Sequence, residues 1–101
     1  MGRRLPIAEA ALAEVCGRYR IRRLSLFGSA LHGSDRPESD LDLLVEFELD
    51  ARPTLLDMVR IEEELSGLAG GRRIDLRTER DLSRYFRDEV VREAEVQYVA
   101  G

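Results

Sequence analysis

Apolar residues recur along the chain with two different periods, and these periods predict most of its helices and strands. An apolar stripe at three- and four-residue spacing over residues 6–19 predicts an amphipathic helix, with Pro6 in its first turn. Apolar and polar side chains alternate with period two over residues 40–47, which is the pattern of a strand with one buried face. An apolar run over residues 21–27 predicts another strand before it.

The second half of the chain predicts a helix, a short strand and a last helix. Thr54 and Asp57 form a capping-box pattern that starts the first of these helices, and Gly70 with Gly71 ends it. Residues 74–76 form the short strand. The positions expected to form the apolar faces of the two helices are Leu55, Met58, Val59, Ile61, Leu65 and Leu68, then Leu82, Tyr85, Phe86 and Val90.

This order of elements predicts a small mixed sheet with helices packed on one face. The last helix is expected to begin at Asp81 or Ser83, and residues 96–99 to add a short strand. The first two strands are joined by a short loop and can pair antiparallel, whereas the strand at residues 74–76 follows a helix, which favours a parallel crossover. We therefore predict one α/β (α+β) domain over residues 1–101, built around one core.

Composition narrows the class of protein. The chain has 101 residues, 44% hydrophobic and 36% charged, without an apolar run of the roughly 20 residues that a membrane helix requires. We expect neither a signal peptide nor a membrane contact, and therefore a cytoplasmic protein. The net charge of −4 argues against direct DNA binding. The single cysteine, Cys16, lies on the apolar stripe of the first helix and is expected to be a small buried residue.

The absence of lysine excludes several chemistries, because every basic residue is an arginine. A Walker A loop requires a lysine on the phosphates, and Schiff-base catalysis requires a lysine amine. Phosphatases of the haloacid dehalogenase type share an Asp-x-Asp motif but also need a lysine. One histidine and one cysteine leave no zinc site of the usual Cys/His kind.

Asp40 and Asp42 are the sharpest candidates for chemistry. They stand two residues apart on a predicted strand, so both side chains project from the face opposite Leu41 and Leu43, roughly 6.5–7 Å apart along the chain. Two like charges at this range repel and raise at least one pKa unless a cation neutralises them. Carboxylate and phosphate oxygens are the ligands that Mg²⁺ prefers, and a pair of such ions can clamp an in-line phosphoryl displacement.

Asp75 and the turn Gly28-Ser29 extend this candidate site. If the strand of Asp75 lies beside that of Asp42, three carboxylates converge, and Asp75 can hold a metal and accept or orient the proton of an attacking hydroxyl. Taken alone, Asp75 is better explained as a solvent-facing acid. Gly28 lets backbone N–H groups approach a phosphate and Ser29 adds a hydroxyl donor, although such a turn is weak evidence alone.

These motifs together resemble the signature of the DNA polymerase β-type nucleotidyltransferases. Residues 26–33 read Leu-Phe-Gly-Ser-Ala-Leu-His-Gly, and after a short gap residues 39–45 read Ser-Asp-Leu-Asp-Leu-Leu-Val. Ile-Asp-Leu at residues 74–76 matches the third carboxylate strand of that family. More narrowly, the chain from about residue 24 to residue 76 is similar to the minimal nucleotidyltransferases of the MntA-like antitoxin kind.

The resemblance implies an activity and a set of site residues. Asp40 and Asp42 would ligate two Mg²⁺ ions, Asp75 would complete the triad, and Gly28 and Ser29 would hold the triphosphate. The reaction would be the transfer of AMP from ATP to a hydroxyl, with release of pyrophosphate. In MntA-like members the acceptor is a tyrosine of a partner HEPN-type toxin, which is thereby silenced.

Two questions stay open on the sequence alone. Many relatives carry an arginine where this chain has His32, and imidazole is mostly neutral at pH 7, so His32 either contacts phosphate weakly or fills the loop. Arg36 lies nearby and could substitute for it. The alternative to an enzyme is a non-catalytic antitoxin or regulatory module that acts by direct contact. A domain this small has little surface for both nucleotide and acceptor, so a protein partner or a homo-oligomer is expected in either case.

Overall fold

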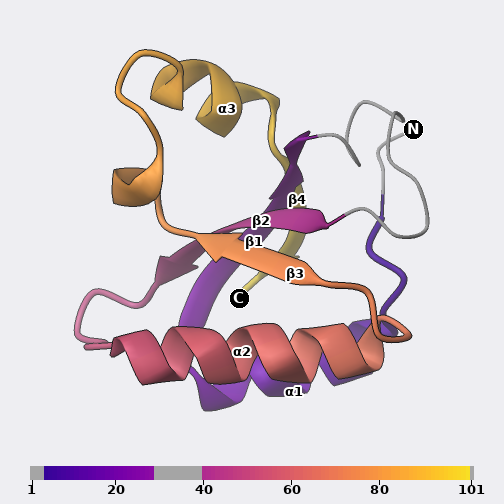
Figure 1. Cartoon of the computed structure of the whole chain (residues 1–101). Helices are drawn as coiled ribbons and strands as arrows, with labels where there is room; N and C mark the ends of the chain where they lie inside the picture. Colours follow the sequence, from indigo (N-terminus) through magenta and orange to yellow (C-terminus); the bar gives the residue numbers. More distant parts are fainter. Residues whose placement is uncertain (1–3, 29–39, 101) are drawn as a thin grey trace.

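A four-stranded mixed sheet lies at the centre of the protein (Figure 1). The computed structural model describes residues 4–28 and 40–100. The strands are β1 (Ile21–Phe27), β2 (Leu41–Phe47), β3 (Ile74–Arg77) and β4 (Glu95–Val99), and their order in the sheet is β3-β2-β1-β4. β1 pairs antiparallel with β2 and with β4, and β2 pairs parallel with β3. The predicted mixed sheet, with its antiparallel first pair and its parallel crossover, is confirmed.

Two helices, α1 (Glu9–Arg18) and α2 (Leu55–Leu68), lie side by side under one face of the sheet (Figure 1). The core fills the space between them and the strands, and alternation in β2 directs Leu41, Leu43 and Val45 into it. Cys16 is fully buried in this core, and burial raises the pKa of its thiol to about 12. The prediction that Cys16 is a small buried residue is therefore confirmed.

The first helix is shorter than its apolar stripe predicts. α1 begins at Glu9 after the N-cap residue Ala8, so Pro6 lies before the helix and not in its first turn as predicted. Leu5 is nevertheless buried, and its N–H donates to Oε1 of Gln97 on β4 at 2.9 Å. The segment before α1 is therefore anchored by the burial of Leu5 in the core and by its hydrogen bond to β4, although it is not helical.

The predicted capping box at the start of α2 is confirmed. The Asp57 N–H donates to Oγ1 of Thr54 at 3.1 Å, and the Thr54 N–H donates to Oδ2 of Asp57 at 2.9 Å. We expect Thr54→Ala to lower the free energy of unfolding by about 1 kcal/mol, because it removes one acceptor for an otherwise unpaired N–H of the helix. Urea denaturation measures this loss. Thr54→Ser keeps the oxygen, so a similar loss in that variant would contradict the capping explanation.

The apolar face of α2 is narrower than predicted. Ile61 and Leu65 are fully buried and Met58 is partly buried, but Leu55 is 87% exposed and Leu68 is 40% exposed. Val59 is exposed as well. The prediction was wrong for these outer positions because one sheet face and α1 cover only the inner side of the helix, whereas the apolar stripe extends around it.

The last helical segment lies on the other side of the sheet from α1 and α2 (Figure 1), so the predicted packing of helices on one face holds for α1 and α2 and not for this segment. It consists of a short 3₁₀ helix, η2 (Glu79–Asp81), a turn, and α3 (Arg87–Glu93). A helix beginning at Asp81 or Ser83 was therefore a wrong prediction. Thr78 and Asp81 close a capping box around η2, and the chain then turns before α3 begins. Two of the residues predicted to form a buried face, Tyr85 and Phe86, are 85% and 49% exposed.

The predicted strand at residues 96–99 is present as β4. Among the residues that the structure describes, none of the helices combines the length and the apolar character needed to cross a membrane.

Candidate functional site

Asp42 and Asp75 stand side by side on the sheet face opposite the core. Asp42 on β2 is the register partner of Asp75 on β3, and their flanking residues Leu41 and Ile74, also paired, point into the core. Neighbouring strands lie about 4.8 Å apart, so side chains in register on one face are close neighbours. The parallel pairing that the crossover imposes therefore brings together two carboxylates that are 33 positions apart in sequence, since 75 − 42 = 33.

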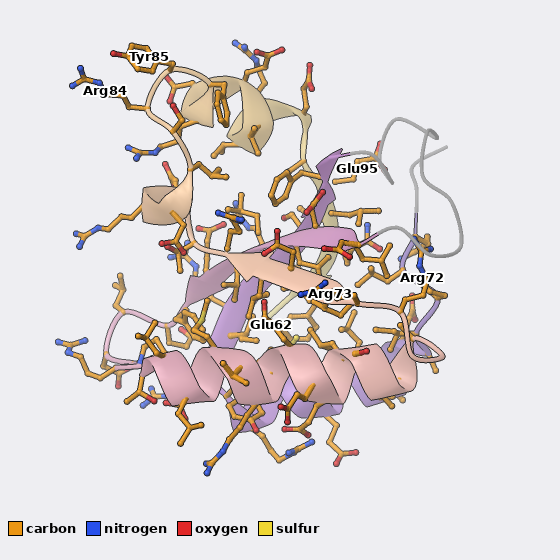
Figure 2. The ribbon with its side chains drawn as sticks, viewed as in Figure 1. Glu62, Arg72, Arg73, Arg84, Tyr85 and Glu95 are labelled. Carbon is orange, nitrogen blue, oxygen red and sulfur yellow. The ribbon has the colours of Figure 1, made fainter. Side chains whose placement is uncertain are left out.

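The edge strand that carries Asp75 is fixed by a side chain from α2. The N–H of Leu76 donates to Oε2 of Glu62 at 2.8 Å, and Figure 2 shows Glu62 beneath β3 on α2. On its inner side, β3 is joined at its start to β2, where the Leu41 N–H donates to the Arg73 carbonyl at 2.8 Å. These two contacts hold both edges of the short strand, and they fix the position of Asp75 beside Asp42.

The electrostatic environment of Asp42 favours its protonated form. Partial burial is the largest cause that raises the pKa of its carboxyl, and the charges of Asp75 and Asp40 raise it further. The guanidinium of Arg77 acts in the opposite direction without cancelling the rise. A repulsion of this kind between like charges is what a bound cation would relieve, so the site is suited to one.

Gly28 ends β1 directly against the Asp42 carboxylate. Phe27 is the register partner of Asp42, and Gly28 follows with φ of +79°, a conformation that favours glycine. A Cβ added to Gly28 would lie 2.2 Å from Oδ2 of Asp42 and 3.0 Å from its Cγ. The backbone of the turn therefore approaches the carboxylate within a space that no side chain can share.

Arg77 follows Asp75 on the same face of β3 and interacts with it. Its Nη2 and Nε donate to Oδ2 of Asp75 at 3.3 and 3.4 Å. Both side chains remain partly exposed, Arg77 by 47% and Asp75 by 33%. The ion pair therefore lies at the mouth of the site, where water still reaches both partners.

A cleft of about 240 Å³ opens over the two carboxylates. It lies between the sheet and the segment that contains η2 and the turn before α3. The residues that line it are Phe27, Asp42, Asp75, Arg77, Asp81, Leu82, Ser83 and Phe86. Another hollow of about 290 Å³, between α1 and α2, contains none of the residues predicted for the site.

The remaining predicted site residues are Asp40, Ser29, His32 and Arg36. Asp40 stands immediately before β2, and its charge contributes to the raised pKa of Asp42. Within residues 4–28 and 40–100, no group of three or more His, Cys, Asp or Glu side chains is gathered into an arrangement that could hold a metal ion. The structure therefore pairs Asp42 with Asp75 but does not close Asp40 with them into one cluster. Ser29, His32 and Arg36 lie outside the described residues.

Several residues of the cleft were not predicted from the sequence. Arg77 was not among the predicted site residues, although its spacing of two residues from Asp75 on a strand was a usable signal. The apolar wall formed by Leu82 and Phe86 was assigned to the buried face of a helix. Nothing in the local sequence distinguishes an apolar residue that lines a cleft from one that lies in a core.

Comparisons with known proteins identify a matching family and similar proteins. Residues 11–99 match the family described as Polymerase beta, Nucleotidyltransferase. The chain is 36% identical over 87 residues to the protein adenylyltransferase MntA of Thermococcus cleftensis (strain DSM 27260 / KACC 17922 / CL1). The matched region covers 86% of this chain and 85% of that protein.

Solved structures show the same arrangement of elements. A candidate minimal nucleotidyltransferase shares 43% sequence identity and a TM-score of 0.69, with 85% of each chain covered. A toxin–antitoxin structure with AMP-PNP has a TM-score of 0.71 at 19% identity, with 93% of this chain and 75% of that chain covered. At this low identity the second comparison shows the fold alone.

Proposed function

Because this chain belongs to the polymerase β nucleotidyltransferase family, we propose that it transfers AMP from ATP to a hydroxyl group of a partner protein. The observation that carries this proposal is the register pairing of Asp42 with Asp75 beside the Gly28 turn. The name of the relative MntA, a protein adenylyltransferase, supports the choice of a protein as the acceptor. The toxin–antitoxin neighbour with AMP-PNP supports an adenine nucleotide as the donor.

The proposed acceptor is a tyrosine of a cognate toxin of the HEPN type, so the chain would act as an antitoxin in the cytoplasm. A phenol hydroxyl on an exposed loop of a partner can enter an open cleft. The site of this chain is open in that sense, because its carboxylates and Arg77 are partly exposed. Modification of such a tyrosine would add a bulky anionic group to the toxin and thereby silence it.

The residues of the cleft fit a divalent cation. Asp42 and Asp75 offer hard carboxylate oxygens from neighbouring strands. Burial first, and then the charges of Asp75 and Asp40, raise the pKa of Asp42, and a bound cation would favour its charged form. In the proposed site Asp40, Asp42 and Asp75 would hold Mg²⁺, two ions in the complete site. When bound, Mg²⁺ would neutralise the carboxylates and polarise the phosphoryl oxygens.

The side chains of this protein have separate tasks in the proposed transfer. The acceptor oxygen forms a bond to the α-phosphorus of ATP, the bond from that phosphorus to the bridging oxygen breaks, and pyrophosphate leaves. Asp75 would accept or orient the proton of the attacking hydroxyl. Gly28, which has no Cβ, would let the backbone approach the phosphates, and Ser29 would add a hydroxyl donor.

Binding and transfer test this proposal separately. We expect Mg-ATP to raise the free energy of unfolding by about 2.7 kcal/mol at one hundred times its dissociation constant, because it binds only the folded site. Equal melting temperatures with and without Mg-ATP would count against a nucleotide site.

Transfer itself is measured with radiolabelled ATP and the product of the adjacent gene. Label should appear on a tyrosine of that protein, and pyrophosphate should be released in equal amount. Neutralisation of the toxin without any label would support the alternative, a non-catalytic module that acts by contact.

A further inference from the structure

Arg77 is distinguished by its charge among the residues that line the cleft. Within the described part of the chain, the other charged side chains of the lining are Asp42, Asp75 and Asp81, and Arg77 is the one cation. A nucleoside triphosphate is itself highly anionic, and a cleft lined by three carboxylates repels it. One cation placed among these acids is therefore the natural protein contact for phosphate.

The ion pair between Arg77 and Asp75 is weak enough for Arg77 to exchange it for another anion. Both donor atoms of Arg77 reach the same oxygen, at 3.3 and 3.4 Å, whereas strong pairs of this type are about 2.7–2.9 Å long and engage both oxygens. Both partners are also partly exposed, and exposed ion pairs contribute little to stability. Arg77 can leave Asp75 at small cost to the fold.

The neighbouring charged groups already have other partners. Asp81 accepts from the Thr78 N–H and from the Thr78 hydroxyl, both at 3.0 Å, and so serves as the cap of η2. Arg87 donates to the Leu82 carbonyl at 2.9 Å. Arg84 lies over the ring of Tyr85, and Figure 2 shows both side chains directed away from the sheet. Among the described arginines of the cleft and of the segment that covers it, Arg77 is the one paired with a carboxylate of the site.

We propose that Arg77 binds the β- and γ-phosphates of the nucleotide, exchanging its contact with Asp75 for phosphate oxygens when the substrate enters the cleft. This proposal rests on the proposed nucleotidyltransfer function and assigns a triphosphate-specific contact to that site. The guanidinium is planar and can bind phosphate bidentately, which its present contact to one carboxylate oxygen does not use. The same contact would offset the charge that develops on pyrophosphate as it leaves.

Calorimetric binding of two ligands tests the proposal without requiring turnover. The ligands are a non-hydrolysable ATP analogue with Mg²⁺, and AMP, which lacks the β- and γ-phosphates. We expect Arg77→Gln to weaken binding of the analogue by about tenfold to a hundredfold, the range of a lost charge-assisted contact, and to leave AMP binding unchanged. Arg77→Lys keeps the charge but not the fork, so it should recover part of the loss.

Arg80→Gln is the matched control. It makes the same change in net charge three residues further along, where Arg80 lines a separate hollow with Arg22 and Glu46. We expect it to bind both ligands as the wild-type protein does. Equal binding of the analogue by Arg77→Gln and by the wild type would overturn the proposal. Equal weakening of the analogue and AMP would overturn it as well, because the contact would then not be to the β- and γ-phosphates.

Failure of the proposed function would give a different result. If the wild-type protein binds the analogue through Arg77 but transfers no label to any hydroxyl, then the assignment of Arg77 stands and the transfer activity is refuted. If the wild-type protein does not bind the analogue at all, both fail. A melting temperature for each variant shows whether the substituted chains are folded.

Discussion

Replacing Asp42 with Asn should reduce AMP transfer by at least about a hundredfold, while the folded protein stays at least as stable as the wild type. Removing a residue that only supports a metal ligand costs about tenfold to a hundredfold in metal affinity or activity. Removing a proposed ligand itself should therefore reduce activity further. Stability should not fall, because the substitution removes a charge that Asp75 and Asp40 repel. Steady-state transfer of labelled AMP and urea denaturation measure the two effects.

The difference in unfolding free energy between Asp42→Asn and the wild type should increase with pH. Burial and neighbouring charges raise the pKa of Asp42, so the folded protein binds this proton more tightly than the unfolded chain does. The stability that Asp42 contributes is therefore fully present below its unfolded pKa and is lost as pH rises through its folded pKa. As pH increases from about 4 toward 7, the unfolding free energy of Asp42→Asn should rise relative to that of the wild type.

Asp50→Asn is a control with the opposite expectation. The hydrogen bond from Arg20 holds the pKa of this exposed carboxyl below its ordinary value. Its contribution to stability is present above the unfolded pKa and is lost as pH falls, so the Asn variant should be slightly less stable near pH 7 and should transfer AMP normally. Full transfer by Asp42→Asn, or an equal loss in Asp50→Asn, would refute the assigned role of Asp42.

The elements that position the site were predictable because their signals are local. Period-two alternation placed Asp42 opposite Leu43 on β2, and Thr54 with Asp57 marked the start of α2. The helix between two strands then favoured the parallel pairing that brings Asp75 beside Asp42. Each of these steps uses only neighbours in sequence or a general rule of chain connection.

The remaining features depend on contacts that no local pattern encodes. Whether Leu55 and Leu68 are buried depends on how much of α2 the sheet and α1 cover. Whether Phe86 lies in a core or in a cleft wall depends on where the chain turns after η2. The register that places Gly28 within reach of Asp42 also comes from the tertiary pairing of β1 with β2, not from either segment alone.

The second large effect is expected for Gly28→Ala, which should reduce transfer by about a hundredfold and lower the free energy of unfolding by about 1–2 kcal/mol. The loss of stability follows from a positive φ of +79°, which costs an L-residue with a side chain about that amount. The loss of activity follows from the added Cβ, which would lie 2.2 Å from Oδ2 of Asp42 and force that carboxylate to move. A displacement of about 1 Å in a catalytic group can cost a hundredfold in rate.

Gly70→Ala separates these two causes. Gly70 has a similar φ of +71°, but an added Cβ there would meet nothing within 4 Å. Both variants should therefore lose a comparable amount of stability in urea denaturation, and only Gly28→Ala should lose transfer. Full transfer activity in both variants would show that the Asp42 carboxylate tolerates displacement. A loss of activity in Gly70→Ala as large as in Gly28→Ala would attribute the effect to backbone strain, because only the Gly28 substitution places a Cβ against the carboxylate.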